Sequence, residues 1–311
     1  MTRAPLPEHP IRVTAPAKLN LGLRIVGRRD DGYHLLESVF VPIDLADDLV
    51  LQLRPGSGVE IDVATGEAGD PDAAHVPRDD RNLAARAARA FLDAAGLAAH
   101  VSIALRKRIP SAAGLGGGSS DAGAVLRGLA EAWPGAVDGP ALESIALSLG
   151  ADVPFFLDPR PAFVSGVGER RRPLGDLPAL PLVLANPRVS VSTAEVFERR
   201  SREAADFAPA GALMQAAEGV RAAGWLDAGA GPAWAGLLVN DLAPAAEAVC
   251  PEMRTLLAAL EATGALASGQ SGSGATVFGV FATSAAAEAA CESLSANDSA
   301  WFRVAISAAA R

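Results

Sequence analysis

The chain has little of what builds disulfide-linked, zinc-bound or membrane-embedded folds. Only two of its 311 residues are cysteines, Cys250 and Cys291, and neither belongs to a CxxC pair. This argues against a disulfide framework and a zinc module. No apolar stretch is long enough to cross a bilayer, and the first nine residues lack the apolar core of a signal peptide. These absences predict a soluble protein of the reducing cytoplasm.

Positive charge is also in short supply. The 36 acidic residues exceed the 27 basic ones, which gives a net charge of -9. Because nucleic-acid binding depends mainly on phosphate neutralisation, this balance argues against a nucleic-acid partner. It leaves room for a small phosphate ligand, since backbone N–H dipoles and local groups can outweigh net charge. Half of the residues are apolar, enough for two domains with substantial cores.

Alternating apolar residues predict strands near the start of the chain. Four of them, from Leu19 to Ile25, fall on one face, while Lys18 and other polar residues fall on the opposite face, as in a half-buried strand. Asp31-Gly32 is a strong turn signal. Further strands are expected over residues 39–43, 49–53 and 59–63, and a helix capped by Asn82 should run to about Ala95.

A strand, a glycine-rich loop and a helix form the most informative segment. The strand ends near Leu105, the loop runs from Pro110 to Ser120, and the helix follows. Its N-cap is expected at Ser119, Ser120 or Asp121. Unpaired N–H groups at a helix start bind anions, and glycines let phosphate oxygens approach the backbone. The loop matches neither the Walker A nor the dinucleotide-binding pattern. By itself it favours phosphate binding only slightly over a flexible turn, and the strand before it and the helix after it strengthen the prediction of phosphate binding.

Asp152 lies between a helix expected over about 141–149 and the apolar run Phe155–Leu157. An Asp at such a place commonly serves a turn, although a carboxylate there can also accept a proton. Pro154 is expected to keep Val153 out of helical geometry.

Beyond about Arg170 the chain reads as a second unit. Strands are expected over residues 181–185 and 303–306, helices after a capping box at Ser192–Glu195 and over 251–263, and a strand, glycine loop and strand around Gly269–Gly274. Residues 206–234 are left unassigned. Helices mix with strands at hairpin-like spacing, which favours an α+β fold over a doubly wound sheet.

Three segments resemble, in order, the three motifs of the GHMP kinase superfamily, which includes galactokinases, homoserine kinases and mevalonate kinases. They are Pro16–Asn20, Pro110–Ser120 and Ser271–Thr276. The resemblance implies a ribosomal-protein-S5-like N-terminal domain over residues 1–170 and a ferredoxin-like C-terminal domain over 171–311, with substrates between them. It also implies transfer of the γ-phosphate of ATP, with Mg²⁺, to a hydroxyl of a small molecule.

The same resemblance implies roles for individual residues. Lys18 and Asp152 would lie at the reacting centre. The ATP phosphates would be bound by the central loop, which consists of Pro110, Ser111, Ala112, Ala113, Gly114, Leu115, Gly116, Gly117, Gly118, Ser119 and Ser120. The ligands of the magnesium ion are left unassigned.

Two local features resemble one branch of the family. They are Asp30–His34 and Gly150–Pro154. That branch acts in the non-mevalonate route to isoprenoid precursors, on the 2-hydroxyl of an acceptor that carries a cytidine diphosphate group. The resemblance implies that Tyr33 and His34 contact the cytosine, since an aromatic ring can stack on a base and an imidazole can hydrogen-bond its edge. Asn20 and Phe197 complete the implied acceptor-binding set.

Two alternatives stay open. Another GHMP kinase, of the homoserine or mevalonate type, would have no use for the Tyr33-His34 pair because its acceptor lacks a base. A non-catalytic, S5-like RNA-binding module is disfavoured by the net negative charge.

Overall fold

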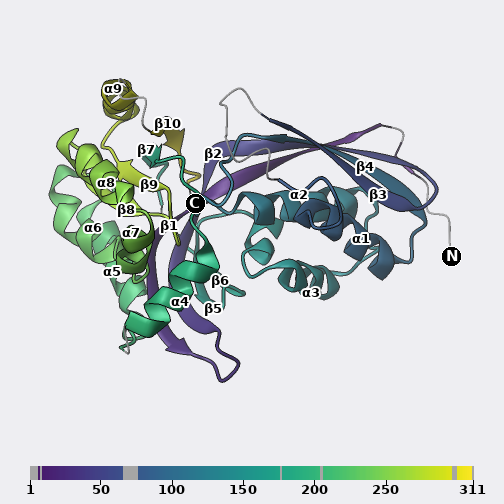
Figure 1. Ribbon diagram of the computed structural model, residues 1–311, viewed down its shortest axis with the longest axis horizontal. Coiled ribbons are helices and arrows are strands. Elements are labelled where there is room, and N and C mark those ends of the chain that lie inside the picture. Colours follow the sequence, from purple (N-terminus) through teal and green to yellow (C-terminus); the bar gives the residue numbers. More distant parts are fainter. Residues whose placement is uncertain are drawn as a thin grey trace. The chain divides into compact units, whose positions relative to one another are not determined.

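The computed structural model describes residues 6–7, 9–65, 76–175, 177–203, 206–295 and 300–309 (Figure 1). The chain forms two compact units whose boundaries do not follow chain order. The first contains Met1–Ala17, Leu45–Ser111 and Gly116–Pro159, and the second contains Lys18–Asp44, Ala112–Leu115 and Arg160–Arg311. The predicted boundary at residue 170 divides the chain into two family domains that are continuous in sequence, unlike these two units. It stays a prediction.

The first unit is a sheet with helices on one face (Figure 1). Strands β3 (Gly58–Thr65) and β4 (Ala99–Lys107) are parallel and are joined by α1 (Leu83–Ala95). Strand β4 is antiparallel to the end of β2 (His34–Pro55). Burial alternates along β4, and its inward side chains share a core with those of α1 and α2 (Gly117–Ala132), with Phe91, Val101, Ile103, Leu126 and Leu129 among its members.

Helix α1 begins and ends where the sequence predicts. The Asn82 side chain accepts a hydrogen bond from the N–H of Ala84 at 2.9 Å, and Gly96 ends the helix in the left-handed region at φ 63°. The start of α2 differs from the prediction. Its N-cap is Gly116, at φ 71°, and no side chain caps it. The N-cap expected at Ser119, Ser120 or Asp121 is therefore wrong. Glycine adopts this backbone conformation without strain, so the helix begins before the hydroxyl residues.

The segment after α3 (Gly139–Leu149) is also more helical than expected. Val153–Leu157 forms a short 3₁₀ helix, η2, so the non-helical geometry predicted for Val153 is wrong. Pro154 occupies a first-turn position, where a helix needs no N–H from it. Asp152 precedes η2 directly, on the turn where the sequence placed it.

Strands β1 (Ile11–Arg28) and β2 pair with each other and are joined by the turn at Asp31-Gly32. The separate strands predicted over 39–43 and 49–53 are one continuous strand, in which the intervening Asp47 is fully buried. The half-buried pattern predicted for β1 is also incomplete, since residues 17–23 are buried on both faces.

The second unit contains a four-stranded antiparallel sheet in the order β10-β7-β9-β8. Its strands are β7 (Pro181–Asn186), β8 (Ala267–Gln270), β9 (Val277–Val280) and β10 (Trp301–Ile306). Helices connect β7 to β8 and β9 to β10, the latter through α9 (Ser284–Ser295). This order and connectivity are ferredoxin-like, and the predicted α+β fold is confirmed.

The remaining elements of the second unit surround this sheet or extend β2. Ser192 caps the helix that follows it through the N–H of Glu195, at 3.3 Å. The segment left unassigned contains two α-helices and a 3₁₀ helix. The elements are β5 (Ala162–Gly166), β6 (Arg170–Pro173), α4 (Thr193–Glu203), α5 (Ala212–Ala223), η3 (Ala228–Ala230), α6 (Gly231–Leu237), α7 (Ala243–Val249) and α8 (Glu252–Ala262). In the part of the chain described, no helix combines the length and apolarity needed to cross a membrane.

Candidate active site

Lys18 lies in the stretch of β1 that is buried on both faces, and it is only 4% exposed. Its ammonium donates to the Asn20 Oδ1 atom and to the backbone oxygen of Gly114, at 3.0 Å. It also lies 4.9 Å from the centre of the Phe40 ring, a position that favours a cation. A buried charge needs partners of this kind. Lys18 is therefore an oriented, buried cation and not a solvated side chain of the strand.

The hydrogen bonds of Asn20 fix the orientation of its amide. The Ser38 hydroxyl donates to the Gly22 backbone oxygen at 2.6 Å, so its oxygen accepts from Asn20 Nδ2, at 2.8 Å. This leaves Asn20 Oδ1 facing the Lys18 ammonium. The geometry makes Asn20 an orienting residue for Lys18, and its contact with the acceptor stays a prediction.

Gly114, in the central loop, packs backbone to backbone against the third motif, Ser271–Thr276, which is the glycine loop between β8 and β9 (the third glycine loop). Its φ is 76°, and a Cβ atom added there would lie 2.2 Å from the Ser271 oxygen and 2.9 Å from the Gly274 oxygen. The N–H of Thr276 donates to the Ala113 oxygen at 3.1 Å. Only glycine fits at residue 114, because any side chain would overlap the neighbouring backbone.

Two buried amides that sequence reasoning missed hold the third glycine loop. Asn240 Nδ2 donates to the backbone oxygens of Gln270, at 3.2 Å, and Gly272, at 2.8 Å. Gln270 Nε2 donates to the same Gly272 oxygen at 2.9 Å. Because the C=O and N–H of one trans peptide point in opposite directions, the N–H of Ser273 points away from these amides. No local pattern marks Asn240, which follows the segment left unassigned.

The second half of the central loop is the first turn of α2. Its first N–H groups have no acceptor within the helix, and the helix dipole adds partial positive charge there. Gly117 and Ser119 are partly exposed, and Gly118 is exposed. The hydroxyl of Ser120 is engaged elsewhere, since this residue is fully buried and donates to the Pro16 oxygen at 2.7 Å. The turn can therefore bind an anion through its backbone.

Asp152 lies at the start of η2 and is half-buried. Its backbone oxygen accepts from the N–H of Phe155 at 3.2 Å, which closes the first turn. Its carboxylate is held on a short rigid segment whose next four residues are all buried. Asp152 belongs to the first unit, whereas Lys18 belongs to the second.

His34, at the start of β2, lies beside α4. Its Nε2 atom is 3.0 Å from the Ser201 hydroxyl, and its ring centre is 5.4 Å from that of Phe197. The structure thus brings together two of the predicted acceptor-binding residues. Tyr33, by contrast, is 66% exposed.

The electrostatic surroundings of His34 favour a neutral imidazole. Burial, together with the nearby guanidinium groups of Arg28 and Arg200, lowers the pKa of His34 from its ordinary value of 6.5. The Ser201 hydroxyl donates to the Phe197 backbone oxygen at 2.9 Å, so Nε2 of His34 donates to Ser201. Nδ1 is then the acceptor of the ring.

Comparison with known proteins identifies the family. Residues 82–158 match the model of the GHMP kinases N-terminal domain, and residues 216–300 match that of the GHMP kinases C-terminal domain. A 4-diphosphocytidyl-2-C-methyl-D-erythritol kinase of Deinococcus radiodurans is 41% identical to this chain over 93% of the chain and 90% of that protein. The chain belongs to the GHMP kinase family.

Solved structures of GHMP kinases share this fold. The crystal structure of a 4-(cytidine 5'-diphospho)-2C-methyl-D-erythritol kinase is 37% identical, covers 96% of this chain and all of that one, and has a TM-score of 0.72. A homoserine kinase from Cytophaga hutchinsonii has the same TM-score, with 99% and 98% of the two chains covered, but is 20% identical. The similarity to the homoserine kinase supports the fold alone.

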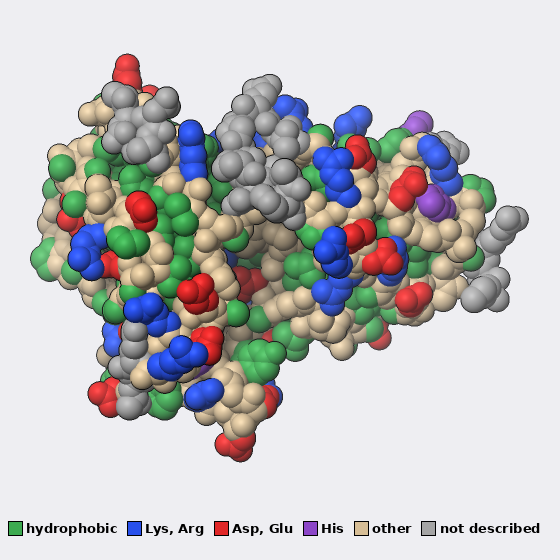
Figure 2. Space-filling view, viewed as in Figure 1, with side chains coloured by type: hydrophobic (Ala, Val, Ile, Leu, Met, Phe, Trp, Pro, Cys, Tyr) green, Lys and Arg blue, Asp and Glu red, His purple; other side chains and the backbone are tan. Residues whose placement is uncertain are grey.

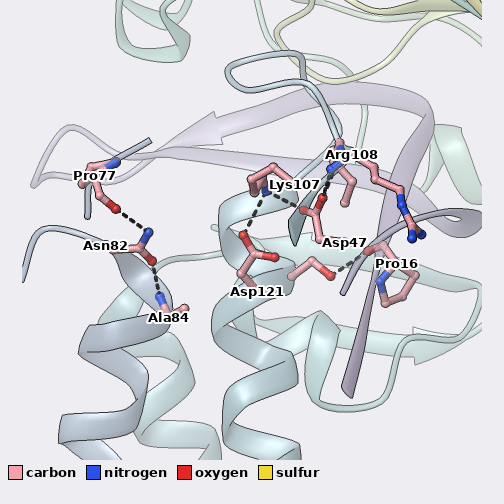
Figure 3. A network of polar contacts seen from close by, with 10 residues as sticks. Pro16, Asp47, Pro77, Asn82, Ala84, Lys107, Arg108 and Asp121 are labelled. Atoms are coloured by element: carbon pink, nitrogen blue, oxygen red, sulfur yellow. Dashed lines mark hydrogen bonds and ion pairs between the residues drawn. The ribbon is translucent and has the colours of Figure 1, made fainter. Parts of the chain in front are cut away.

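This GHMP kinase also contains a buried charge cluster that sequence reasoning missed: Asp47, Lys107 and Asp121 (Figure 3). Lys107 Nζ donates to Asp47 and, at 2.9 Å, to Asp121. Asp47 is fully buried, and Lys107 and Asp121 are 4% and 3% exposed. One signal could have found Lys107. Lys107 continues the alternation of Val101 and Leu105, whose side chains point into the core. The alternation therefore predicts that the charged side chain of Lys107 lies on the buried face of β4.

The cluster holds two carboxyl groups and one ammonium, so its charges balance only when one of the carboxyl groups is protonated. Burial raises the pKa of Asp121 from 3.8 to about 7, with the charge of Lys107 opposing the shift and that of Asp47 adding to it. The two carboxylates outweigh burial at Lys107, whose pKa is raised. Because the pKa of Asp121 is higher in the folded state than in the unfolded state, its stabilising contribution is lost as pH rises through about 7.

Proposed function

We propose that this GHMP kinase transfers the γ-phosphate of ATP to the 2-hydroxyl of 4-diphosphocytidyl-2-C-methyl-D-erythritol, in the non-mevalonate route to isoprenoid precursors. The observation that carries the proposal is the 41% identity to a kinase of that name across nine tenths of both chains. The neutral His34 beside Phe197 supports the proposal, because these two side chains can bind the base of such an acceptor.

ATP is bound through its phosphates by the central loop in this proposal. The exposed start of α2 supplies backbone N–H groups and the positive end of the helix dipole. Gly114 fixes the first half of the loop against the third glycine loop. The N–H of Ser273, directed away from Asn240, is a further donor for developing negative charge.

Magnesium belongs to this reaction class, and when bound with ATP it neutralises phosphate charge. The described residues hold no group of three or more His, Cys, Asp or Glu side chains placed to bind a metal. A magnesium site made mainly of phosphate oxygens and water, with one or two protein oxygens, needs no such group. The anion-binding start of α2 fits this arrangement, and we assign no protein ligand to the ion.

Lys18 and Asp152 carry the chemistry in this proposal. Asp152 accepts the proton of the attacking hydroxyl as the new P–O bond forms and the bond from the γ-phosphorus to the departing ADP breaks. Lys18 stabilises the charge on the transferring phosphoryl group, and its fixed hydrogen bonds keep reorganisation small. The rigid η2 segment and the buried β1 strand give each group a defined position.

The cytosine is read by His34 and Phe197. Since His34 Nε2 donates to Ser201, its Nδ1 atom can accept a hydrogen bond from the exocyclic amine of cytosine. Phe197 and the exposed Tyr33 offer rings on which a base can stack.

The expected setting is the cytoplasm, without a nucleic-acid or membrane partner. Both cysteines are free thiols, which suits a reducing compartment. Figure 2 shows basic side chains interspersed with acidic ones on the visible face, whereas nucleic-acid binding calls for a basic surface.

A phosphate-transfer assay tests the function. The purified chain is incubated with ATP, Mg²⁺ and one acceptor at a time: the cytidylylated methylerythritol, homoserine or mevalonate. We expect ADP release only with the first, and ³¹P NMR should place the new phosphate on the 2-hydroxyl. Turnover with homoserine or mevalonate would reassign the enzyme within its family, and binding of RNA without ATP turnover would favour the non-catalytic alternative.

Replacing His34 by Ala should weaken binding of the cytidylylated acceptor about ten- to a hundredfold, the cost of one or two hydrogen bonds to a partly buried base. ATP affinity should stay within about threefold. Calorimetric titration of each ligand measures both effects. Tyr33→Ala is a matched variant that removes the neighbouring exposed ring. Equal losses for ATP and acceptor in His34→Ala would contradict a cytosine role.

Replacing Gly118 by Val should lower ATP affinity by at least about tenfold, because its branched side chain occupies the space where phosphate oxygens approach. A Cβ atom at Gly118 meets only Leu83 Cδ1, at 3.6 Å, so the fold should survive. Gly117 is less suitable, since a Cβ there would lie 3.1 Å from Ile109 and 3.2 Å from Lys107 Nζ. Normal ATP binding by a folded Gly118→Val protein would mean that the loop is a structural turn.

A further inference from the structure

The carboxylate of Asp47 holds the backbone where the chain enters the central loop. One of its oxygens accepts from the N–H groups of Arg108 and, at 2.9 Å, Ile109. Its other oxygen accepts from Lys107 (Figure 3). A single buried carboxylate thus orients three consecutive residues that lead directly into Pro110, the first residue of the loop.

Lys107 extends this hold to the far end of the loop. Its ammonium donates to Asp121, in the second turn of α2. A Cβ atom at Gly117, the first residue of that helix, would lie 3.2 Å from the same Nζ atom and 3.1 Å from Ile109 Cγ2. The cluster therefore lies directly against the helix start that presents N–H groups for phosphate.

We propose that Asp47 is a positioning residue for ATP binding: through the N–H groups of Arg108 and Ile109 and through Lys107, it fixes both ends of the phosphate-binding loop relative to each other. This rests on the proposed function of that loop. Pre-organised donors bind phosphate without a cost of reordering the loop. Apolar residues of similar volume can often replace a buried ion pair without loss of stability. An apolar residue at position 47 would, however, leave the backbone N–H groups of Arg108 and Ile109 without the oxygen that accepts from both of them.

Asp47→Asn tests the proposal, with Asp48→Asn as its matched control. The Asn side chain keeps the shape of Asp, but one of its two oxygens is replaced by an NH₂ group. That NH₂ group must face either the Lys107 ammonium or the two backbone N–H donors. Asp48 is the adjacent carboxylate, partly exposed, and its side chain pairs with the guanidinium of Arg108 and not with the backbone. We expect the ATP dissociation constant to rise about ten- to a hundredfold in Asp47→Asn, the range for lost charge-assisted hydrogen bonds. Asp48→Asn should bind ATP as the unmodified chain does.

Calorimetry with Mg-ATP and, separately, with the cytidylylated acceptor gives the readout. Acceptor affinity should be unchanged in Asp47→Asn, which distinguishes loop positioning from general loss of structure. Equal ATP affinities in the two variants would overturn the proposal. The result is separable from the proposed substrate, because the ATP measurement stands even if the acceptor proves to be a different alcohol.

Asp121→Asn keeps the proposal testable if Asp47→Asn does not fold. The charged neighbours of Asp121 are Lys107 from β4 and Asp47 from β2. Loss of its proton above about pH 7 leaves the cluster with a net negative charge beside the helix start. Mg-ATP affinity of the unmodified chain should therefore fall several-fold between pH 6 and pH 8, and that dependence should vanish in Asp121→Asn. If the ATP affinity depends on pH equally strongly in Asp121→Asn, or does not depend on pH in the unmodified chain, the charge cluster does not influence phosphate binding.

Discussion

Replacing Lys18 by Met should lower the turnover number roughly 10²–10³-fold, the usual effect of removing one group that stabilises transition-state charge. Met keeps most of the side-chain volume but removes the ammonium that donates to Asn20 and Gly114. Substrate affinities should change much less than turnover, because the phosphoryl charge is redistributed mainly in the transition state. Single-turnover measurements at saturating ATP and acceptor report the chemical step directly.

Ser271→Ala is the control for Lys18→Met. The Ser271 hydroxyl donates to the same Gly114 oxygen at 3.0 Å, so its removal loosens the same loop without removing a charge. We expect less than about a tenfold change in turnover, as for loss of one neutral hydrogen bond. If the two variants lose turnover equally, Lys18 acts by anchoring the loop and not by stabilising charge.

Asp152→Asn should reduce turnover by roughly 10²–10⁴-fold, as for loss of a general base. The amide keeps the size and reach of the carboxylate but lacks its basic oxygen, so binding of ATP and acceptor should change little. Asp158→Asn is the matched control, because Asp158 caps the other end of η2 and is exposed. Its turnover should equal that of the unmodified chain.

Comparison of Lys18→Met with Asp152→Asn also shows whether the transition state of phosphoryl transfer is loose or tight. In a loose, largely dissociative transition state the hydroxyl loses its proton late. Lys18→Met would then be the more damaging change, and Asp152→Asn would retain most of the single-turnover rate. A near-normal chemical step in Asp152→Asn would contradict the base assignment and leave Lys18 as the principal catalytic residue.

Elements whose contacts are local could be predicted from the sequence. Helix α1 is one of them, since Asn82 and Gly96 satisfy its ends with atoms a few residues away. The inward alternation of β4 and the turn at Asp31-Gly32 are others. The three motifs, Pro16–Asn20, Pro110–Ser120 and Ser271–Thr276, indicate the family from the sequence alone, because they occur together in a fixed order.

Features that depend on contacts distant in sequence could not be predicted. The aspartates within β2 suggest a break between two strands, yet Asp47 is a strand residue because Lys107, 60 positions later, neutralises it. The N-cap of α2 differs from the predicted one for a related reason. Ser120 contacts Pro16, 104 positions away, instead of capping the helix, and Gly116 provides the turn.

The sequence by itself determined the family, the α+β class and the residues expected to carry the chemistry, because each follows from a short pattern or a local periodicity. Only the tertiary structure decided how those residues are held. It buried Lys18 between Asn20 and Gly114, paired His34 with Ser201 and tied the loop to Asp47. The physical reason is that burial and hydrogen-bond partners depend on which distant segments meet, and such long-range packing has no periodicity along the chain.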